Sequence, residues 1–496
     1  MTNKIQSVQI CCLSVVCLLI ALAGRPVTAV AQSYNTSHES IASYDVPEWY
    51  SEGKLGVFMH LSAFSVPAHR SEWYASNMYS TENSSKAEYR MQFRKYHEET
   101  YGSLKEFGYK DFIPMLKMEK FDADYYAELV EKSGAVYFAA PAVHHDGFAM
   151  WDSKVIEWNA AKMGPKRDVV GELTEAMRKK GIKTGVSTHY GRHWKYYTFR
   201  PEFDTWDPAN EGLYGKRRGD TDPPRPEDAL KWERVMNELI DNYQPDYIFV
   251  DGGVCDARSQ YKKDYYRDAM YRVVANYYNK SVDWDKDVVL SWKRDAMEKG
   301  QAVYDTEGTL EKGIPKRSWQ AHFTVNGRWA YDGPRDARPM DAILRTFVDL
   351  VSRNGNLLLN VGPRPDGTLD ANQENVLLEM GKWMKVNGEG ITGSKPWNTW
   401  GAGKINTLAG GKNVKDYEKD AVRYTRKDGA LYAWFVSWPA GGKVRLPQAA
   451  AFKPVTIQGL GGDGYLKFSK EDDAIVVELP DKTFGKYVWG LKLMHE

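Results

Sequence analysis

Short apolar runs that end in polar residues recur along most of this chain. The run at residues 135–143 is followed by His144 and His145, and the run at 247–250 is followed by Asp251. An apolar run of about four to eight residues bounded by turn signals is typical of a strand buried on both faces. Runs of the same kind end in or just before His60, His189, Lys293 and Arg294, Glu307, His322 and Asn360.

Segments whose apolar residues recur with a period near 3.6, the period of an α-helix, lie between these runs. They cover residues 124–133, 169–178, 229–243, 265–278, 339–352 and 372–386. Strands and helices that alternate over roughly 330 residues predict a (β/α)8-like barrel, larger than the usual ~250 residues and therefore carrying loop insertions. A doubly wound sheet shares this alternation, but no Gly-x-Gly-x-x-Gly sequence opens a helix and no Walker-type loop is present.

The pattern changes after about residue 391, where Gly- and Asn-rich loops separate short strand-like runs without a helical period. This pattern of short strands and loops is typical of a small antiparallel β-sandwich. We therefore predict an α/β chain in which a (β/α)8-like barrel at residues 32–392 is followed by a C-terminal antiparallel β-sandwich at residues 393–496. We expect the sandwich to cover one side of the barrel, although such a domain can also bind carbohydrate.

The first 31 residues have the features of a secretory signal peptide. Lys4 precedes an apolar stretch at residues 8–23, and the sequence Ala-Val-Ala at residues 29–31 matches a cleavage site. Cleavage there predicts a secreted or periplasmic protein. Three of the four cysteines lie in this segment and only Cys255 remains, so we predict no internal disulfide. The apolar stretch is slightly short for a membrane-spanning helix, and we predict no span elsewhere.

The charge and composition narrow the class of partner. The formal net charge is +1, which argues against nucleic acid or an anionic membrane surface as a ligand. Aromatic residues make up 13% of the chain, and many of them fall in predicted loops. Aromatic faces stack on the C–H faces of sugars, whereas imidazole, carboxylate and cationic groups bond the sugar hydroxyls. A barrel that presents both kinds of side chain therefore points to carbohydrate chemistry.

Six of the ten histidines lie at or just beyond predicted strand ends, which is where a barrel enzyme places its active-site residues. Adjacent residues on a strand face opposite ways, so His144 and His145 can share a ligand only where the strand ends in a loop. A single histidine at a strand end is usually structural. The recurrence of histidine, carboxylate and cation at these positions instead predicts one polar pocket.

Two motifs of this chain are specific in combination. One is His144-His-Asp-Gly-Phe148, and the other is Val-Ser-x-Asn-Gly-Asn-Leu-Leu-Leu-Asn-x-Gly-Pro, which ends at Pro363. With further matching segments at residues 54–60 and 244–252, the chain resembles the α-L-fucosidases of glycoside hydrolase family 29 over about residues 49–397. The resemblance implies a catalytic barrel with a β-sandwich, no cofactor, and retaining hydrolysis of terminal α-L-fucose from fucosylated or related oligosaccharides and polysaccharides.

By this resemblance the family's nucleophile falls on Asp251, whose approach is uncrowded because Gly252 and Gly253 follow it. A retaining glycosidase needs an ionised carboxylate about 5–5.5 Å from a carboxylic acid that protonates the leaving oxygen. We favour Glu311 as this acid/base, because it precedes Lys-Gly much as a family glutamate precedes Arg-Gly. Glu307 lies nearer the strand end and is the alternative. Either residue would need a raised pKa to be protonated when substrate binds.

The resemblance also transfers sugar-binding roles residue by residue, and a family arginine falls near Lys293 or Arg294. The chain departs from the family at residues 59–62, 187–194 and 319–322, all of which face the same predicted pocket. These departures bear on which sugar is bound more than on the fold or mechanism. The predicted substrate-binding residues are His60, Glu72, Trp73, His144, His145, His189, Trp194, Arg294 and Trp319.

The sequence leaves three alternatives open. An α-L-galactosidase or a hydrolase of modified, for example sulfated, fucosides would use Arg192 and the added histidines for a more polar ligand. A catalytically inactive carbohydrate-binding protein would keep the pocket without the chemistry, although Asp251 and an available acid argue against it. A zinc hydrolase would use the His-His-Asp cluster, but no His-Glu-x-x-His sequence is present, so we predict no metal site. The oligomeric state is unknown from the sequence.

Overall fold

The structure is a computed structural model that describes residues 33–252, 264–293, 297–298, 300–405, 407–408 and 417–495. The predicted signal peptide at residues 1–31 and the predicted substrate-binding residue Arg294 lie outside the described residues. The chain from Tyr34 onward forms one compact unit. In the part of the chain that the structure describes, no helix combines the length and the apolar character that a membrane span requires.

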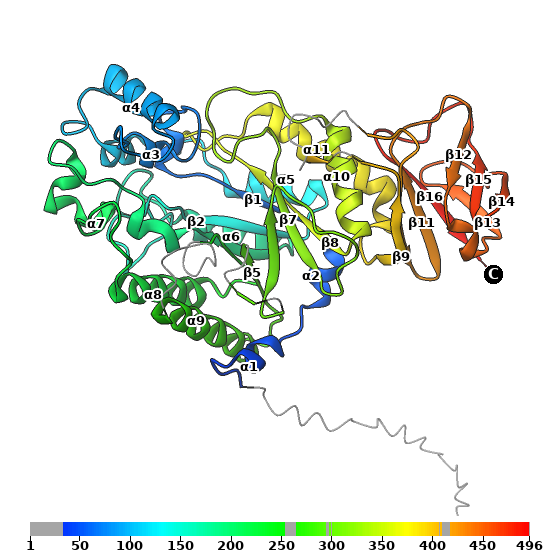
Figure 1. Ribbon diagram of the computed structural model, residues 1–496, viewed down its shortest axis with the longest axis horizontal. Coiled ribbons are helices and arrows are strands. Elements are labelled where there is room, and N and C mark those ends of the chain that lie inside the picture. Colours follow the sequence, from blue (N-terminus) through cyan, green and yellow to red (C-terminus); the bar gives the residue numbers. More distant parts are fainter. Residues whose placement is uncertain are drawn as a thin grey trace, which may run out of the picture. The chain divides into compact units, whose positions relative to one another are not determined.

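Eight parallel strands close into a barrel in the order in which they occur along the chain (Figure 1). The first strand, β1, pairs in parallel with both β2 and β8, and this pairing closes the barrel. The strands are β1 (Leu55–Met59), β2 (Tyr137–Val143), β3 (Lys183–Thr188), β4 (Tyr247–Val250), β5 (Val289–Lys293), β6 (Val303–Glu307), β7 (Trp319–Thr324) and β8 (Gly355–Val361). The predicted barrel is thus confirmed, and each strand falls on one of the apolar runs.

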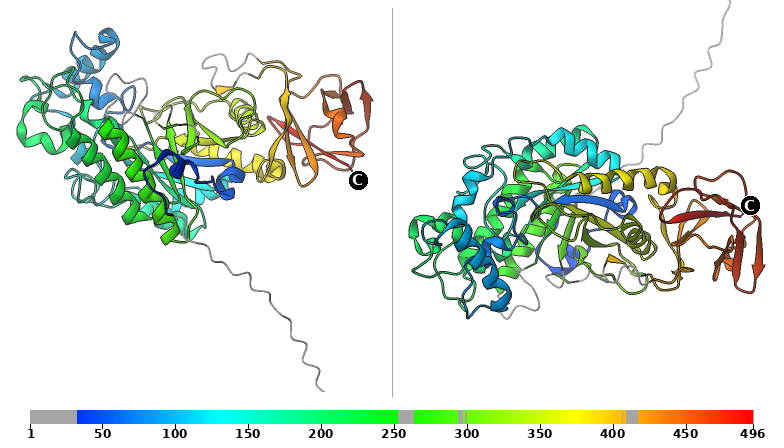
Figure 2. Two further views of the ribbon diagram at one scale, coloured as in Figure 1. Left: turned by 60° about the horizontal axis from the view of Figure 1, so that its bottom comes forward. Right: turned by 90° about the horizontal axis from the view of Figure 1, so that it is seen from above.

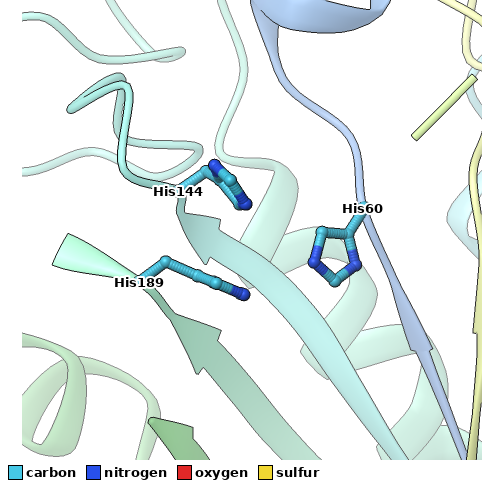
Figure 3. Close-up of side chains that lie close together, drawn as sticks. All are labelled: His60, His144 and His189. Carbon is cyan, nitrogen blue, oxygen red and sulfur yellow. The ribbon is translucent and has the colours of Figure 1, made fainter. Parts of the chain in front are cut away.

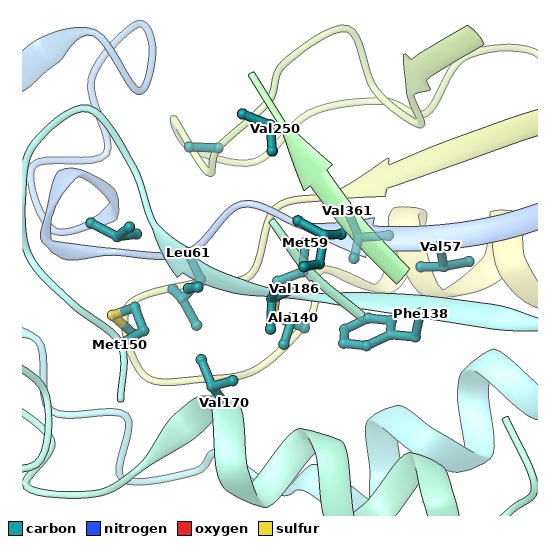
Figure 4. Close-up of a cluster of buried hydrophobic side chains, with 14 of the residues drawn as sticks. Val57, Met59, Leu61, Phe138, Ala140, Met150, Val170, Val186, Val250 and Val361 are labelled. Carbon is teal, nitrogen blue, oxygen red and sulfur yellow. The ribbon is translucent and has the colours of Figure 1, made fainter. Parts of the chain in front are cut away.

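Successive residues of a strand face opposite sides of the barrel wall, and both sides are buried, which is why most residues of the runs are apolar. On β1, Phe58 packs inside the barrel, whereas Val57 and Met59 pack outside it. On β2, Phe138 also faces outward, and these outer side chains belong to the same buried apolar cluster as Val170 of the covering helix layer (Figure 4). Burial on both faces leaves polar side chains to gather where the strands end.

One buried amide, that of Gln320 on β7, organises the interior of the barrel. Its Oε1 accepts hydrogen bonds from the hydroxyls of Tyr50, Tyr137 and Tyr247 at 3.0, 2.8 and 3.1 Å. Its Nε2 donates to Oδ2 of Asp305 at 2.6 Å. Because a buried polar group without partners is costly, this network favours one register of strands β2, β4, β6 and β7.

Helices cover the outside of the barrel (Figure 1). Asp122 and Asp168 cap two of them, since their carboxylates accept hydrogen bonds from the backbone N–H groups of Tyr125 and Gly171. The covering helices are α5 (Ala123–Ser133), α6 (Val169–Lys179), α8 (Pro226–Tyr243), α9 (Asp264–Asp283), α10 (Met340–Ser352) and α11 (Ala371–Asn387). Shorter or inserted helices are α1 (His38–Ala42), α2 (Glu48–Gly53), α3 (Tyr74–Asn77), α4 (Ala87–Tyr101) and α7 (Glu211–Tyr214).

After α11 the chain forms two antiparallel sheets, as predicted, drawn in orange and red in Figure 2. One sheet has five strands in the order β13-β16-β11-β10-β9, and the other has three in the order β12-β15-β14. A separate apolar core, which includes Leu431, Ile475 and Leu491, joins them. The strands are β9 (Lys395–Ala402), β10 (Val422–Lys427), β11 (Ala430–Phe435), β12 (Lys443–Leu446), β13 (Thr456–Gly459), β14 (Phe468–Glu471), β15 (Ala474–Glu478) and β16 (Trp489–Met494).

Polar contacts connect these sheets to the helices of the barrel. Arg423 of β10 forms a fully buried ion pair with Asp349 of α10. The indole of Trp383 on α11 donates a hydrogen bond to the backbone oxygen of Val488 at 2.8 Å. The two parts therefore share an interface within one compact unit, and the boundary between residues 392 and 393 stays a prediction.

Candidate active site

The carboxyl ends of the barrel strands surround a cavity of about 190 Å³. This is small beside the roughly 300–1,000 Å³ of pockets for drug-sized ligands, so the cavity suits a single sugar ring. Its lining residues are Phe58, His60, Glu72, Trp73, His144, His145, His189, Arg192, Phe249, Asp251, Gly252, Lys293, Glu307, His322 and Trp329.

Backbone pairing positions three of these residues directly beyond their strands. The N–H groups of His60, His189 and Asp251 donate to the last carbonyl of a neighbouring strand at 3.0, 2.8 and 2.9 Å. The parallel ladder therefore continues one residue past β1, β3 and β4. This extension fixes where each side chain enters the cavity, as the sequence pattern predicts.

Two carboxylates in the cavity share one cation. The ammonium Nζ of Lys293 lies 3.0 Å from Oδ1 of Asp251 and 2.7 Å from Oε2 of Glu307. These residues end or follow β5, β4 and β6, so neighbouring strands bring them together. Two oxygens held by the same ammonium at these distances lie less than about 6 Å apart, which is shorter than the ~6.5–9.5 Å carboxyl separation of inverting glycosidases.

The shared cation sets the charge states of both carboxylates. Burial alone would raise the pKa of Asp251, but Lys293 and then the neighbouring imidazoles outweigh burial and hold this pKa well below its usual range. Burial would likewise raise the pKa of Glu307, and Lys293 again reverses the effect and lowers it. Burial would lower the pKa of Lys293, whereas the two carboxylates raise it. Asp251 is therefore ionised at neutral pH.

Five histidines line the same cavity, and burial keeps four of them uncharged. Burial lowers the pKa of His60 to about 4, and it lowers the pKa values of His144, His145 and His189 well below the usual range. Figure 3 shows the imidazoles of His60, His144 and His189 directed toward one another from three successive strands. Neutral imidazoles can both donate and accept hydrogen bonds, which suits sugar hydroxyls.

The turn after β2 is stabilised by groups that do not line the cavity. Oδ2 of Asp146 accepts hydrogen bonds from the hydroxyls of Ser62 and Tyr109 at 2.7 and 2.6 Å. Gly147 has a φ of +80°, and a Cβ at this position would lie 2.4 Å from the ring of His193. The Asp and Gly of the motif are therefore structural, and they orient the two histidines that precede them.

Glu72 and Trp73 enter the cavity from the loop that follows β1. Burial raises the pKa of Glu72 to about 7. The indole of Trp73 lies 5.1 Å from the ring of His145, measured between centroids. The pair therefore offers a carboxyl group that is partly protonated near neutral pH and an aromatic face beside the histidines.

An aromatic group forms another side of the cavity. Phe58 and Phe249 lie 5.5 Å apart between ring centroids in an edge-to-face arrangement. Trp329 stands 5.0 Å from His322 and 5.5 Å from His60. This side is largely apolar, so it matches the less polar part of a sugar.

Most of the predicted site residues meet in this cavity, but three described residues do not. Trp194 lines a different cavity, which it shares with Tyr190 and His193. Trp319 packs at the start of β7, where its Nε1 donates to the backbone oxygen of Arg353 at 2.9 Å. Glu311 lies in the loop after β6, outside the residues that line the site. Trp319 begins β7 and so lies at the opposite end of the barrel, whereas Trp194 and Glu311 lie in the loops after β3 and β6, and their side chains do not line this cavity.

Seven residues that line the cavity are not among the predicted catalytic or substrate-binding residues: Phe58, Arg192, Phe249, Gly252, Lys293, His322 and Trp329. The alternation of side chains along β5 is the signal that could have selected Lys293. Lys293 pairs with Asp305, which faces the interior of the barrel, so the next residue, Arg294, falls on the opposite side of the alternation. His322 carries the same signal, since it pairs in register with Glu307. Trp329 lies in an irregular loop after β7, where no periodic pattern predicts its direction.

A closed parallel barrel with paired carboxylates and aromatic walls at its strand ends fits cleavage of a glycosidic bond. The fold and the site together define a glycoside hydrolase. The comparisons with known proteins agree: the alpha-L-fucosidase family model matches residues 22–389, and the model of the alpha-L-fucosidase C-terminal domain matches residues 415–494. The chain belongs to the α-L-fucosidase family.

Curated relatives and solved structures extend over nearly the whole chain. Tissue alpha-L-fucosidase of Rattus norvegicus is 29% identical over 96% of each chain, and that of Bos taurus is 30% identical over 93% of this chain and 91% of its own. The crystal structure of Thermotoga maritima alpha-fucosidase covers 93% of this chain and 100% of its own, with a TM-score of 0.74 and 26% identity.

Proposed function

We propose that this protein is a retaining exo-α-L-fucosidase that releases terminal α-L-fucose through a covalent glycosyl-enzyme. One observation carries the proposal: Asp251 and Glu307 face the same cavity and are both bound to Lys293, at 3.0 and 2.7 Å. Carboxyl groups this close leave no room for the water that an inverting enzyme holds between sugar and base. The family of the chain and the activity for which its relatives are named support the choice of fucose.

Asp251 is the proposed nucleophile. Its lowered pKa keeps it ionised, which a group that attacks the anomeric carbon must be. Lys293 contacts its Oδ1, whereas His145 and His189 lie 3.8 and 3.6 Å from its Oδ2. Gly252 follows without a side chain that would block approach. When the glycosyl bond forms, Asp251 loses its charge and the ammonium of Lys293 is left to Glu307.

Glu307 is the proposed acid/base, in place of the Glu311 favoured by the sequence pattern. Glu307 lines the cavity and contacts Lys293, whereas Glu311 does not line the cavity. In the second step, in which water attacks the glycosyl-enzyme, Lys293 no longer pairs with a charged Asp251. Its ammonium then favours the carboxylate form of Glu307, which is the form that can remove a proton from water. In the first step Glu307 must carry a proton, and its lowered pKa makes that form more abundant at acidic pH.

The other residues of the cavity hold the sugar. His60, His144 and His145 supply neutral hydrogen-bonding groups, and Trp73 supplies an aromatic face for C–H groups. The apolar side formed by Phe58, Phe249 and Trp329 suits the methyl group at C5 of L-fucose. A sugar held in this way is enclosed at one end, so cleavage removes a terminal residue.

A hydrolase of L-galactosides or sulfated fucosides is the second candidate, because Arg192 also lines the cavity and L-galactose carries a hydroxyl where fucose has a bare methyl. Buried donors opposite a methyl group would be left without partners, at about 1–3 kcal/mol each. An inactive binding protein is disfavoured, since both catalytic carboxylates are present in one cavity.

The predicted signal peptide supports a secreted or periplasmic location. The proposed division of the chain into domains is a barrel at residues 32–392 and a sandwich at residues 393–496.

The experiment is hydrolysis of matched aryl α-L-fucosides and α-L-galactosides, with and without a sulfate, followed by ¹H NMR. We expect the highest kcat/KM for the plain fucoside and α-L-fucose as the first product anomer. A preference for the galactoside or the sulfated sugar would favour the second candidate. Release of the β-anomer would contradict retention for any of these substrates.

A further inference from the structure

Three buried histidines at the base of the cavity form a cluster that sugar binding alone does not require. His60, His144 and His189 follow β1, β2 and β3, and each offers a ring nitrogen within 4.8 Å of the other two (Figure 3). These residues are 5%, 7% and 5% exposed, so all three are buried. His189 completes the cluster in the segment at residues 187–194, where the sequence departs from the family pattern.

We propose that His60, His144 and His189 bind a divalent transition-metal ion, with Zn²⁺ as the reference ion, and that the bound ion excludes the sugar. Three imidazoles with an open fourth position are an established donor set for Zn²⁺. A Zn–N distance of about 2.0–2.1 Å in a tetrahedral site places the nitrogens about 3.3 Å apart. The nitrogens here are within 4.8 Å of one another, so side-chain rotations that move the nitrogens by about an ångström form the site.

The orientation of His60 is already set by a neighbouring amide. Oδ1 of Asn360 lies 2.7 Å from Nδ1 of His60, and Nδ2 of Asn360 donates to the backbone oxygen of Trp329 at 2.7 Å. Because the amide nitrogen is used by Trp329, the amide oxygen faces the imidazole and accepts its Nδ1–H. Nε2 of His60 therefore presents a lone pair, and such an outer hydrogen bond is the usual support of a metal-bound histidine.

His144 can turn without losing a hydrogen bond at its Nδ1. Nδ1 of His144 is buried and has no hydrogen-bond partner among the described residues. The rings of His144 and His189 are 4.4 Å apart between centroids. A ligand between them gives the unpaired nitrogen of His144 a partner, whereas rotation of its ring breaks no hydrogen bond.

The position of the ion explains why it excludes sugar. Nε2 of His189 lies 3.6 Å from Oδ2 of Asp251, so a bound ion lies beside the carboxylate proposed to attack the sugar. The same three imidazoles line the cavity, and one ion among them takes the place of the sugar hydroxyls. The ammonium of Lys293, 3.0 Å from Asp251, opposes the charge of the ion and makes binding reversible. Binding of the ion stands apart from the proposed function, whereas the exclusion of sugar rests on it.

The test uses the purified full-length protein after chelation and dialysis, without any glycoside. Titration with ZnCl₂ in a calorimeter is expected to show one ion bound per chain, and CoCl₂ is expected to give the visible absorption of a tetrahedral site. His189→Phe removes one ligand and keeps a planar ring, and we expect its affinity for Zn²⁺ to fall roughly tenfold or more. His495→Gln is the control, because this exposed histidine lies in the C-terminal residues, and its affinity is expected to match that of the parent.

Free L-fucose is expected to weaken Zn²⁺ binding in the parent, which connects the ion to the sugar cavity. Equal Zn²⁺ affinity in the parent and His189→Phe would overturn the proposal. If that variant does not fold, anomalous scattering from crystals of the parent grown with ZnCl₂ decides: density among the three imidazoles supports the site, and density elsewhere or none contradicts it. Zinc binding that L-fucose leaves unchanged would retain the metal site and reject the exclusion of sugar.

Discussion

Asp251 and Glu307 leave different strands of the barrel and are bound to the same ammonium group, that of Lys293, at 3.0 and 2.7 Å. This relationship connects the fold to the chemistry. It brings the proposed nucleophile and the proposed acid/base within the separation expected of a retaining glycosidase, and it makes the charge of each carboxylate depend on the other. Removal of one carboxylate should therefore change the pKa of the other.

The choice between Glu307 and Glu311 is tested by leaving-group dependence. An activated phenolate departs with little protonation, whereas a sugar alcohol needs a general acid. We expect Glu307→Ala to lose about 10²–10⁴-fold in kcat/KM on a fucosylated oligosaccharide and far less on a dinitrophenyl fucoside. Azide should partly restore its turnover by attacking the glycosyl-enzyme.

Glu311→Ala serves as the matched control for this measurement, because it removes the same group four residues away. We expect it to remain near the parent on both substrates. The opposite result, with leaving-group dependence in Glu311→Ala alone, would return the acid/base role to Glu311.

The pH dependence of kcat/KM distinguishes two proton donors. A general acid must be protonated in the free enzyme, so activity falls as pH rises through its pKa. Burial raises the pKa of Glu72 to about 7, whereas at Glu307 Lys293 outweighs burial and lowers the pKa. If Glu307 is the donor, kcat/KM begins to fall with rising pH while the solution is still acidic. The pH of this fall is then the same in Glu72→Gln, even where that variant binds sugar less well. A limb near pH 7 that is lost in Glu72→Gln would assign the proton to Glu72.

Gly147 tests how the turn after β2 holds the histidines. A Cβ there would lie 2.4 Å from the ring of His193, and the φ of +80° adds backbone strain. We expect Gly147→Ala to displace His145 and His193 and to lower kcat/KM at least tenfold. Gly102→Ala is the control, because its φ is +97° but nothing lies within 4 Å of its Cβ. It should cost about 1–3 kcal/mol of stability and leave activity intact. Equal activity in the two variants would contradict a positioning role for the turn.

The ion pair between Arg423 and Asp349 tests how the C-terminal sheets are joined to the barrel. Both side chains are 2% exposed, and removal of one partner from a buried pair typically costs about 3–5 kcal/mol. Because Arg353 also contacts Asp349 at 3.0 Å, we expect Arg423→Met to fall at the lower end, near 3 kcal/mol, in urea unfolding. Arg445→Met breaks an exposed pair with Glu471 and should cost less than about 1 kcal/mol. Similar losses in both variants would show that the buried pair has no special role.

The sequence predicted the barrel because burial on both faces makes each strand a recognisable apolar run, as at residues 135–143. It predicted His60 and Asp251 because backbone pairing carries the residue after a strand into the cavity. It misplaced Trp194 and Trp319, whose indoles pack elsewhere, because an aromatic near a strand carries no signal of direction. The preference for Glu311 followed a local motif, whereas the cavity depends on which side chains neighbouring strands bring together.

The central claim is that Asp251 forms a covalent bond with the sugar, and Asp251→Asn should lower kcat by several orders of magnitude with the fold intact. Trapping tests the bond itself. The protein is incubated with 2-deoxy-2-fluoro-α-L-fucosyl fluoride, and the intact mass and peptide masses are measured. We predict one fluorofucosyl group per chain, attached to Asp251 and absent in Asp251→Asn. An adduct on Glu307 or Glu72, or inactivation without any adduct, would contradict the account.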